Sequence, residues 1–371
     1  LFGSATRSFQ LANIKKKGII MNKKLKITLA MLMMMTMVLL TSCTSQKAEF
    51  NSAETSQLSQ AEETTETNQI VESSATQTDN EQTKVITHMK GTTEIPNNPK
   101  RLVDLSGSAE ELDIIGVPYI ACAQTSMFDG VTIPEHLKES FDSRGIETVG
   151  NWSGMTDINI ERIVELQPDL IIMNAYSEKI YDQLCEIAPT VMLTDDYSYV
   201  QWRNRFLELG EWFDKEDVVE DWLKEYDDKA INLSTKVKEH VGNETFAVLE
   251  RNSVAFGSYY IYGVSAGPGE IVFKDLNLNR TDITPADTWA NVVDLESLAA
   301  VDADHIIFTS DDGTLGELEG NAVWNSLKAV KNKNVYLGRN SLQYDLAYTA
   351  AGKLVYMEKL ANAIIEKHNI E

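Results

Sequence analysis

Uninterrupted hydrophobic runs alternate with amphipathic stretches along most of the chain. Residues 169–173 read Asp-Leu-Ile-Ile-Met, an apolar run that follows the helix breaker Pro168. A strand that is apolar on both faces is typical of a parallel sheet covered by helices on both sides. Short runs of the same kind predict strands at residues 101–105, 119–123, 190–193 and 245–250. Residues 160–166 have helical spacing, and the alternation of strands with helices predicts an α/β fold.

Two helix signals stand out in this pattern. The segment Ser108-Ala-Glu-Glu111 has capping-box spacing, which predicts a helix from that point to Gly116. Residues 216–240 place apolar side chains at helical spacing over about 37 Å at 1.5 Å per residue. These apolar side chains are Val219, Trp222, Leu223, Tyr226, Leu233 and Val237. Another helical stretch precedes this one without a strand between, so we expect linking helices between two halves of the chain.

An internal repeat supports two related halves. The helix–turn–strand pattern of residues 160–173 reappears at residues 295–308, and Glu161 and Asp169 recur at the same offset as Glu296 and Asp304. Units of this kind are common, so coincidence is the alternative. The repeat and the long helix together predict two parallel-sheet α/β lobes joined by one long α-helix, with a ligand cleft between the lobes.

The N-terminal region has the order of a secretory signal peptide. Three lysines at positions 23, 24 and 26 precede an uncharged apolar run at residues 27–40, and small residues then lead into Cys43. The run is too short to span a bilayer of roughly 30 Å comfortably as a helix. Leu-Thr-Ser-Cys43 is similar to the lipobox of bacterial lipoproteins, in which the cysteine is acylated. The alternative is an ordinary signal peptide with an incidental cysteine.

Composition divides the rest of the chain. We interpret residues 1–20, upstream of Met21, as a non-native or untranslated leader and residues 21–42 as the signal peptide. Cys43 and the Ser-, Thr-, Gln- and Glu-rich residues that follow to 83 are expected to form a disordered tether. The remaining ~290 residues exceed what one core usually serves. We predict an N-terminal lobe at 84–198, linking helices at 199–242 and a C-terminal lobe at 243–371.

Charge excludes two classes of partner. The chain has a net charge of −23, and without residues 1–42 it has 26 basic and 56 acidic residues and a net charge of −30. Such a field repels nucleic acid and anionic lipid, so neither is expected to bind the folded part.

Cysteine and histidine spacing indicates no metal or redox site. Besides Cys43 the chain has only Cys122 and Cys185, without a Cys-x-x-Cys motif, and we predict two buried free thiols. The five histidines, at positions 88, 136, 240, 305 and 368, include no close pair in sequence. A directly metal-binding receptor would need several such ligands converging on one point.

Several segments together resemble a known family. These are Asn-Pro-Lys-Arg-Leu-Val at 98–103, residues 157–173, Ile-Ala-Pro-Thr-Val at 187–191, Gly-Pro-Gly-Glu at 267–270 and residues 298–308. With the lipobox and the tether, they resemble the substrate-binding lipoproteins of ABC importers. Within that family the chain is similar to the helical-hinge group that binds iron–siderophore complexes, vitamin B12 or haem. Residues 187–191 are more similar to the siderophore binders, whereas Trp152-Ser-Gly-Met155 resembles the B12 branch.

This resemblance implies a function. The chain would be a monomeric receptor outside the cytoplasm, anchored to the bacterial cell membrane by palmitate or a related lipid on Cys43. It would bind an Fe(III)–siderophore complex and deliver it to the permease and ATPase of an importer. The resemblance implies no enzymatic activity, no intrinsic cofactor and no protein metal ligands, because the chelator supplies them. Vitamin B12 and haem remain alternative ligands.

Strand ends suggest which side chains contact the ligand, because ligands of parallel α/β lobes bind at the carboxyl ends of the strands. Trp152 and Trp289 each precede a copy of the repeat, and Tyr176 follows the strand that ends at Met173. Large rigid aromatic side chains in such loops can grip a bulky ligand. The alternative for each tryptophan is a place in the core of its lobe.

Two arginines also follow predicted strands. Arg251 comes directly after residues 245–250, and Arg339 follows residues 335–337. A guanidinium group offers five donors to the oxygen atoms around a chelated metal, and surface salt bridges are the alternative. The resemblance adds Tyr344 and Tyr348, in the loop after Arg339, as aromatic contacts.

The resemblance also implies that one acidic residue on each lobe docks the permease. Glu161 and Glu270 occupy the matching positions at or near helix starts. Opposite charges at such an interface would set its register and speed encounter. The alternative is stabilisation of a helix N-terminus, worth about 0.3–1 kcal/mol.

One motif favours an enzyme instead. Gly263-Val-Ser265-Ala-Gly267 matches the nucleophile-elbow pattern of hydrolases and follows a strand-like run at 259–262. A secreted serine hydrolase that uses Ser265 is therefore a further alternative. It would need a loop histidine, and neither His305, in an apolar strand, nor His368, in the C-terminal helical tail, is well placed.

Overall fold

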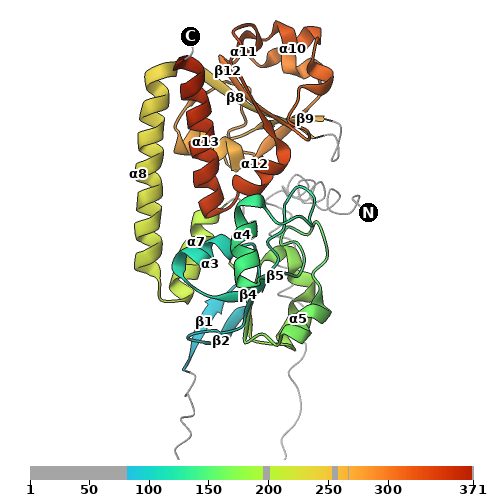
Figure 1. The fold of residues 1–371 in the computed structure, drawn as a ribbon, viewed down its shortest axis with the longest axis vertical. Coiled ribbons are helices and arrows are strands. Elements are labelled where there is room, and N and C mark those ends of the chain that lie inside the picture. The colour runs from blue at the N-terminus through green and yellow to red at the C-terminus, as the bar shows by residue number, and fades with distance from the viewer. Residues whose placement is uncertain (1–81, 195–200, 253–257, 266, 370–371) are drawn as a thin grey trace, which may run out of the picture. The chain divides into compact units, whose positions relative to one another are not determined.

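Two β-sheets carry the two halves of the chain in the computed structural model (Figure 1). The structure describes residues 82–194, 201–252, 258–265 and 267–369. The leader, the signal peptide, Cys43 and almost all of the predicted tether lie outside these residues. We call the elements from β1 to β7 the N-lobe and those from β8 to α12 the C-lobe.

The N-lobe sheet is entirely parallel, with the strand order β5-β4-β3-β6-β7. Its strands are β3 (Leu102–Leu105), β4 (Tyr119–Cys122), β5 (Glu147–Thr148), β6 (Leu170–Met173) and β7 (Thr190–Met192). The helices are α3 (Ala109–Ile115), α4 (Glu135–Arg144), α5 (Ile160–Leu166), the 3₁₀ helix η1 (Ala175–Ile180) and α6 (Tyr181–Cys185). A separate antiparallel hairpin comprises β1 (Thr83–His88) and β2 (Gly91–Pro96).

The C-lobe sheet is mixed, with the order β11-β9-β8-β12-β13 and β10 beside β8. Strands β8, β12 and β13 are parallel, but β9 and β11 run antiparallel to their neighbours. Only a few residues separate β8 from β9, which permits a hairpin but no helical crossover. The strands are β8 (Thr245–Asn252), β9 (Ser258–Tyr262), β10 (Asn279–Arg280), β11 (Ala290–Val293), β12 (His305–Ser310) and β13 (Val335–Arg339).

Short helices join the C-lobe strands. They are α9 (Gly267–Glu270), the π-helical turn η2 (Ile271–Asp275), the 3₁₀ helices η3 (Glu296–Ala300) and η4 (Gly316–Leu318), α10 (Ala322–Ser326), α11 (Lys328–Lys331) and α12 (Asn340–Leu346). The fold class is confirmed as α/β with two lobes and a long helix. The prediction of a parallel sheet in both lobes is wrong for the C-lobe, because β9 and β11 pair antiparallel where the connection from β8 is too short for a helical crossover. The exact boundaries of the lobes stay predictions.

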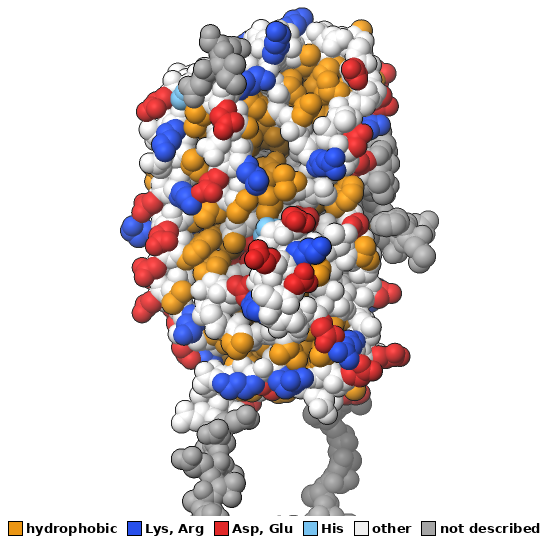
Figure 2. All heavy atoms as spheres, in the orientation of Figure 1, with side chains coloured by type: hydrophobic (Ala, Val, Ile, Leu, Met, Phe, Trp, Pro, Cys, Tyr) orange, Lys and Arg blue, Asp and Glu red, His pale blue; other side chains and the backbone are white. Residues whose placement is uncertain are grey.

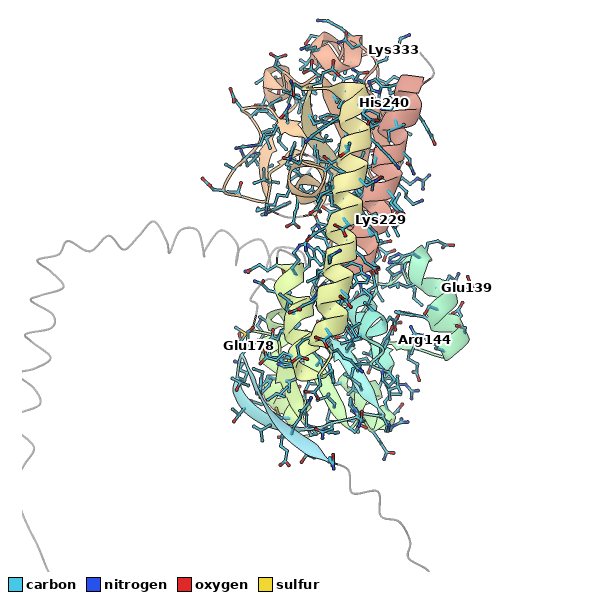
Figure 3. The ribbon with its side chains drawn as sticks, turned by 90° about the vertical axis from the view of Figure 1, so that its left-hand side faces the viewer. Glu139, Arg144, Glu178, Lys229, His240 and Lys333 are labelled. Atoms are coloured by element: carbon cyan, nitrogen blue, oxygen red, sulfur yellow. The ribbon has the colours of Figure 1, made fainter. Side chains whose placement is uncertain are left out.

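Long helices connect the lobes. After α7 (Trp202–Trp212), α8 (Glu216–Val241) runs beside the C-terminal helix α13 (Ala350–Asn369), and Lys229 of α8 pairs with Glu358 of α13 at 2.5 Å (Figures 1 and 3). One hydrophobic cluster includes Leu102 of β3, Tyr226 of α8 and Ile307 of β12. The link between the lobes is therefore a packed core rather than an open hinge.

The internal repeat has the same role in each lobe. Asp169 accepts hydrogen bonds from the backbone N–H groups of Lys100 and Arg101, at the start of β3. Asp304 accepts from the N–H and hydroxyl of Thr245, at the start of β8. In both lobes this aspartate precedes the strand that pairs in parallel with the strand it holds. The repeat thus corresponds to a common structural unit, although the helix of the second copy is 3₁₀.

The capping-box prediction is half correct. Helix α3 does begin after Ser108, but the Ser108 side chain makes no capping bond. Glu111 instead accepts hydrogen bonds from Arg205 of α7 and from the N–H of Ala350 at the start of α13, at 3.3 Å. The Glu111 carboxylate therefore makes tertiary contacts instead of the local hydrogen bond that a capping box would require.

Glu110 and Glu111 tie the N-lobe to α13. Glu110 accepts from the Thr349 hydroxyl at 2.8 Å and from the Gly352 N–H at 2.7 Å, while Glu111 pairs with Arg205. Both carboxylates are buried, and carboxylates stabilise a helix N-terminus through its free N–H groups and its dipole. We call this group the α13 clamp.

The surface of the described part mixes charge types. Figure 2 shows acidic and basic side chains interspersed over one face, with hydrophobic side chains in patches between them. Within the described part of the chain, every helix is too short or too polar to cross a membrane.

Candidate functional site

The two predicted arginines lie at the carboxyl edge of the C-lobe sheet. Ser310, the last residue of β12, pairs with Arg251 on one side and with Arg339 on the other. Strand spacing places their backbones about 10 Å apart. The structure therefore brings two arginines that are 88 residues apart in sequence to the same edge of the sheet.

The two arginines have different surroundings. Arg251 donates to Glu317 at 3.1 Å, and its side chain is 25% exposed. Hydrogen bonds from Tyr259 and Arg251 lower the pKa of Glu317, so this carboxylate is charged at neutral pH. Arg339 is exposed and has no ion pair with the residues that the structure describes. Arg251 therefore forms the surface salt bridge that was the alternative to ligand binding. An anionic ligand would have to displace Glu317 from Arg251.

A buried carboxylate organises the side chains behind these arginines. Glu250, next to Arg251 on β8, accepts from the Tyr344 hydroxyl at 2.9 Å, from Gln343 at 2.8 Å, from Asn252 at 3.1 Å and from Tyr262. Burial raises the pKa of Glu250, and the hydrogen bonds oppose that rise. Four donors that converge on one carboxylate hold α12 against the ends of β8 and β9.

The predicted aromatic residues of the C-lobe form a connected group. Trp289 stacks on Tyr260 with ring centroids 5.6 Å apart, and Tyr344 stacks on Tyr348 at 6.1 Å. Trp289 and Tyr344 are half-buried, whereas Tyr348 is buried against Gly267. Trp289 and Tyr344 therefore have exposed surface that a ligand can contact, whereas Tyr348 packs beneath Tyr344.

The N-lobe contributes Tyr176 at the carboxyl end of β6. Tyr176 is 36% exposed and lies edge-on to Trp152, with ring centroids 6.3 Å apart. Trp152 itself is 0% exposed, and the structure therefore favours its place in the core over direct contact with a ligand. A side chain on Gly107 would overlap the indole ring, so Gly107 makes room for Trp152.

Two buried asparagines that we did not predict hold these N-lobe loops together. Asn174 donates to the carbonyl groups of Ser106 and Trp152, at 3.0 and 3.1 Å. Asn151 donates to backbone and side-chain oxygens of Thr125 and to the Ser126 carbonyl. The signal for Asn174 was its position directly after a predicted strand.

The loops of the N-lobe reach the C-lobe at α12. The Ser126 hydroxyl donates to Asp345 at 2.5 Å, and the ring centroids of Phe128 and Tyr344 are 6.4 Å apart. In Figure 1, α12 lies between the C-lobe sheet and the N-lobe. Tyr344 and Asp345 of α12 therefore lie at the boundary with the N-lobe.

The proposed docking residues differ in accessibility. Glu161 is exposed in the first turn of α5. Glu270 is 9% exposed and pairs with Lys353 of α13 at 2.8 Å. A buried, paired carboxylate does not present its charge to another protein, so the structure opposes a docking role for Glu270.

The hydrolase alternative lacks its base. Ser265 is half-buried in the turn after β9, and no hydrogen bond joins it to a histidine within the described ranges. His305 is held by Glu244 and by the Tyr336 hydroxyl, and burial lowers its pKa.

The prediction of two buried thiols is partly wrong, because Cys122 is buried but Cys185 is exposed on α6.

A surface hollow of about 750 Å³ lies elsewhere, between α5 and the segment that leads into β7. Ile160, Val164, Pro168 and Ile187 are among its lining residues. Pro168 precedes β6 and Ile187 precedes β7, so the hollow is at the amino edge of the N-lobe strands. It is not the edge at which ligands of parallel sheets bind.

Comparisons with known proteins agree with this architecture. The model of a family described as periplasmic binding protein matches residues 135–342. The iron(3+)-hydroxamate-binding protein FhuD of Bacillus subtilis is 28% identical, over 66% of this chain and 76% of its own length. The protein named "Probable siderophore-binding lipoprotein YfiY", also from Bacillus subtilis, is 29% identical over 79% of this chain and 89% of its own length.

A solved structure supports the fold directly. Staphylococcus aureus SirA, complexed with staphyloferrin B, superposes with a TM-score of 0.61 at 26% identity. The match covers 75% of this chain and 97% of that chain.

Proposed function

Because this chain belongs to the periplasmic binding protein family, we propose that it is a receptor outside the cytoplasm that binds a ferric siderophore for an ABC importer. The observation that carries the proposal is the pair Arg251 and Arg339, on either side of Ser310 at the carboxyl edge of the C-lobe sheet. Guanidinium groups suit the anionic oxygens of a ferric chelate, and aromatic faces suit its bulky organic part. The names of FhuD and YfiY support this ligand class.

Five side chains form the proposed contact surface. Each of them is at least partly exposed to solvent. Each lies either at or next to the end of a strand or in α12. They are Tyr176, Arg251, Trp289, Arg339 and Tyr344. Trp152 and Tyr348 would support the surface from behind. The chelator brings the iron ligands, so the surface needs no carboxylate or histidine of its own for the metal.

Tethering and delivery complete the proposal. The lipobox-like sequence before Cys43 and the lipoprotein name of YfiY support a lipid anchor at that cysteine. The receptor would then hand its ligand to a permease and its ATPase. The α13 clamp and the shared core support delivery with little movement between the lobes.

A fluorescence titration tests the ligand. Trp289 is half-buried within the proposed surface, so a bound ferric chelate is expected to quench it. The purified full-length protein would be titrated with a ferric hydroxamate, a ferric catecholate, ferric citrate, haem and cobalamin. We expect saturable quenching by one ferric chelate, at submicromolar concentration, that is reduced in Trp289→Phe. Saturation by cobalamin or haem alone would overturn the ligand class.

Glu161 is the docking residue that the structure leaves accessible. We expect Glu161→Ala to lower iron–siderophore uptake by cells about tenfold, since charge complementarity of this kind sets encounter rates. Ligand affinity in vitro should stay unchanged. Glu165→Ala is the matched control, because Glu165 is exposed on the same helix and pairs with Arg162. Equal uptake by the two variants would remove Glu161 from the docking interface.

A further inference from the structure

The fold gathers histidines that are distant in sequence at one end of the C-lobe. His305 begins β12, Glu244 directly precedes β8, and His368 lies in the last turn of α13. One ligand atom from each of these three side chains lies within 4.8 Å of the other two. His240, near the end of α8, adds a third imidazole ring, with its centroid 6.4 Å from that of His368 (Figure 3). The absence of a close histidine pair in the sequence concealed this cluster.

Hydrogen bonds orient the rings as metal ligands. Nδ1 of His368 lies 2.9 Å from the Ile364 carbonyl oxygen, and Nδ1 of His240 lies 2.9 Å from the Lys236 carbonyl oxygen. A carbonyl oxygen only accepts, so each Nδ1 carries the proton and each Nε2 keeps its lone pair. A second-shell bond of this kind fixes the tautomer of a ligating histidine.

His305 can adopt the same tautomer. Its Nε2 lies 2.5 Å from Glu244, and its Nδ1 lies 3.2 Å from the Tyr336 hydroxyl. A hydroxyl can accept as well as donate. The proton can therefore move to Nδ1, where Tyr336 accepts it, and Nε2 then faces Glu244 and His368 as a free ligand.

We propose that Glu244, His305 and His368 form a binding site for a divalent transition-metal ion of the zinc class. Two imidazoles and one carboxylate are a known zinc ligand set, with a water molecule in the fourth position. Tetrahedral ligand atoms lie about 3.3 Å apart, so His305 and Glu244 must separate slightly and His368 must approach. The Glu244 side chain is 47% exposed and His368 is half-buried in a terminal turn, whereas His305 is fixed in the core. The side chains that must move to bind the ion, Glu244 and His368, are therefore the ones that reach solvent.

The site is separate from the proposed ligand surface. His305 is the first residue of β12 and Ser310, between the two arginines, is the last. Six strand residues separate the two edges by roughly 16 Å. A bound ion would join the end of α13 to β12 and to the start of β8, and would leave the ligand edge untouched. The inference does not depend on the proposed ligand.

Calorimetric titration with zinc chloride tests the site. The full-length protein would carry no histidine tag and would first be treated with a chelator. We expect one zinc ion per chain and a thermal midpoint that rises with zinc concentration, because a ligand that binds only the folded state stabilises it. Glu244→Gln and His368→Gln should each weaken zinc binding about 100-fold or more, since second-shell partners alone are worth 10–100-fold.

Controls separate this site from other zinc ligands. His136→Gln removes a histidine of the N-lobe that bonds to Glu110 and whose side chain is 22% exposed, and it should leave zinc affinity unchanged. Binding of Co²⁺ should produce the visible absorption of a tetrahedral complex, and His368→Gln should abolish it. Zinc affinity that is equal in the native protein, in Glu244→Gln and in His368→Gln would overturn the proposal.

Discussion

Replacing Glu111 by alanine is expected to lower the free energy of unfolding by about 3–5 kcal/mol, the usual cost of removing one partner from a buried ion pair. Both Glu111 and Arg205 have fully buried side chains. The guanidinium group would lose its carboxylate partner in the centre of the packed link between the lobes. Urea unfolding followed by circular dichroism at neutral pH measures the change.

Two companion variants make this prediction specific. The double variant Glu111→Leu with Arg205→Met removes both charges, and it should recover most of the lost stability because apolar replacement of a buried pair is often neutral. Asp228→Ala breaks an exposed pair with Lys224 on α8 and should change stability by less than about 1 kcal/mol. If the single and double variants are equally unstable, the effect comes from lost packing and not from the unpaired charge.

Replacing both Arg251 and Arg339 by alanine is expected to weaken ferric-siderophore binding at least about 100-fold. Hydrogen bonds to charged groups are worth about 1.5–3 kcal/mol each, and about 1.4 kcal/mol corresponds to a tenfold change in affinity. The fluorescence titration described above measures this loss. The thermal midpoint should change little, because Arg339 is exposed and Glu317, which Arg251 contacts, reaches solvent.

The single variants should differ from each other. Arg339 has no ion pair among the described residues, whereas Arg251 must exchange Glu317 for the ligand. We therefore expect Arg339→Ala to cost more affinity than Arg251→Ala. Arg280→Ala is the matched control, since Arg280 is exposed on the C-lobe and belongs to β10, which pairs with the amino end of β8. Equal affinity in all the arginine variants would place the ligand elsewhere.

The packed link and the α13 clamp bear on how such a receptor would work. Glu110 and Glu111 of the N-lobe hold the first turn of α13, and α13 lies along α8 (Figure 1). Separation of the lobes would expose both carboxylates and Arg205. A binding surface that is largely formed before the ligand arrives avoids most of the ordering cost of association.

Much of the local structure was determined by the sequence alone. The apolar run of residues 169–173, the periodicity of residues 216–240 and the repeat of Asp169 at Asp304 each correspond to an observed element or contact. These signals are local, because a strand buried on both faces or a helix with one apolar face needs a particular residue pattern whatever its neighbours are. Positions at strand ends likewise identified Arg251, Arg339 and Tyr176 as candidates before the structure showed their surroundings.

Only the tertiary structure decided which side chains are accessible and which carboxylates are paired. Trp152 and Tyr176 both follow strands, yet one is in the core and the other is exposed. Glu111 contacts Arg205 and α13 instead of capping its own helix, and Glu270 pairs with Lys353. His305 and His368 approach each other only because the end of α13 packs at the start of β12. Burial and ion pairing depend on residues far apart in the chain, and no local pattern records them.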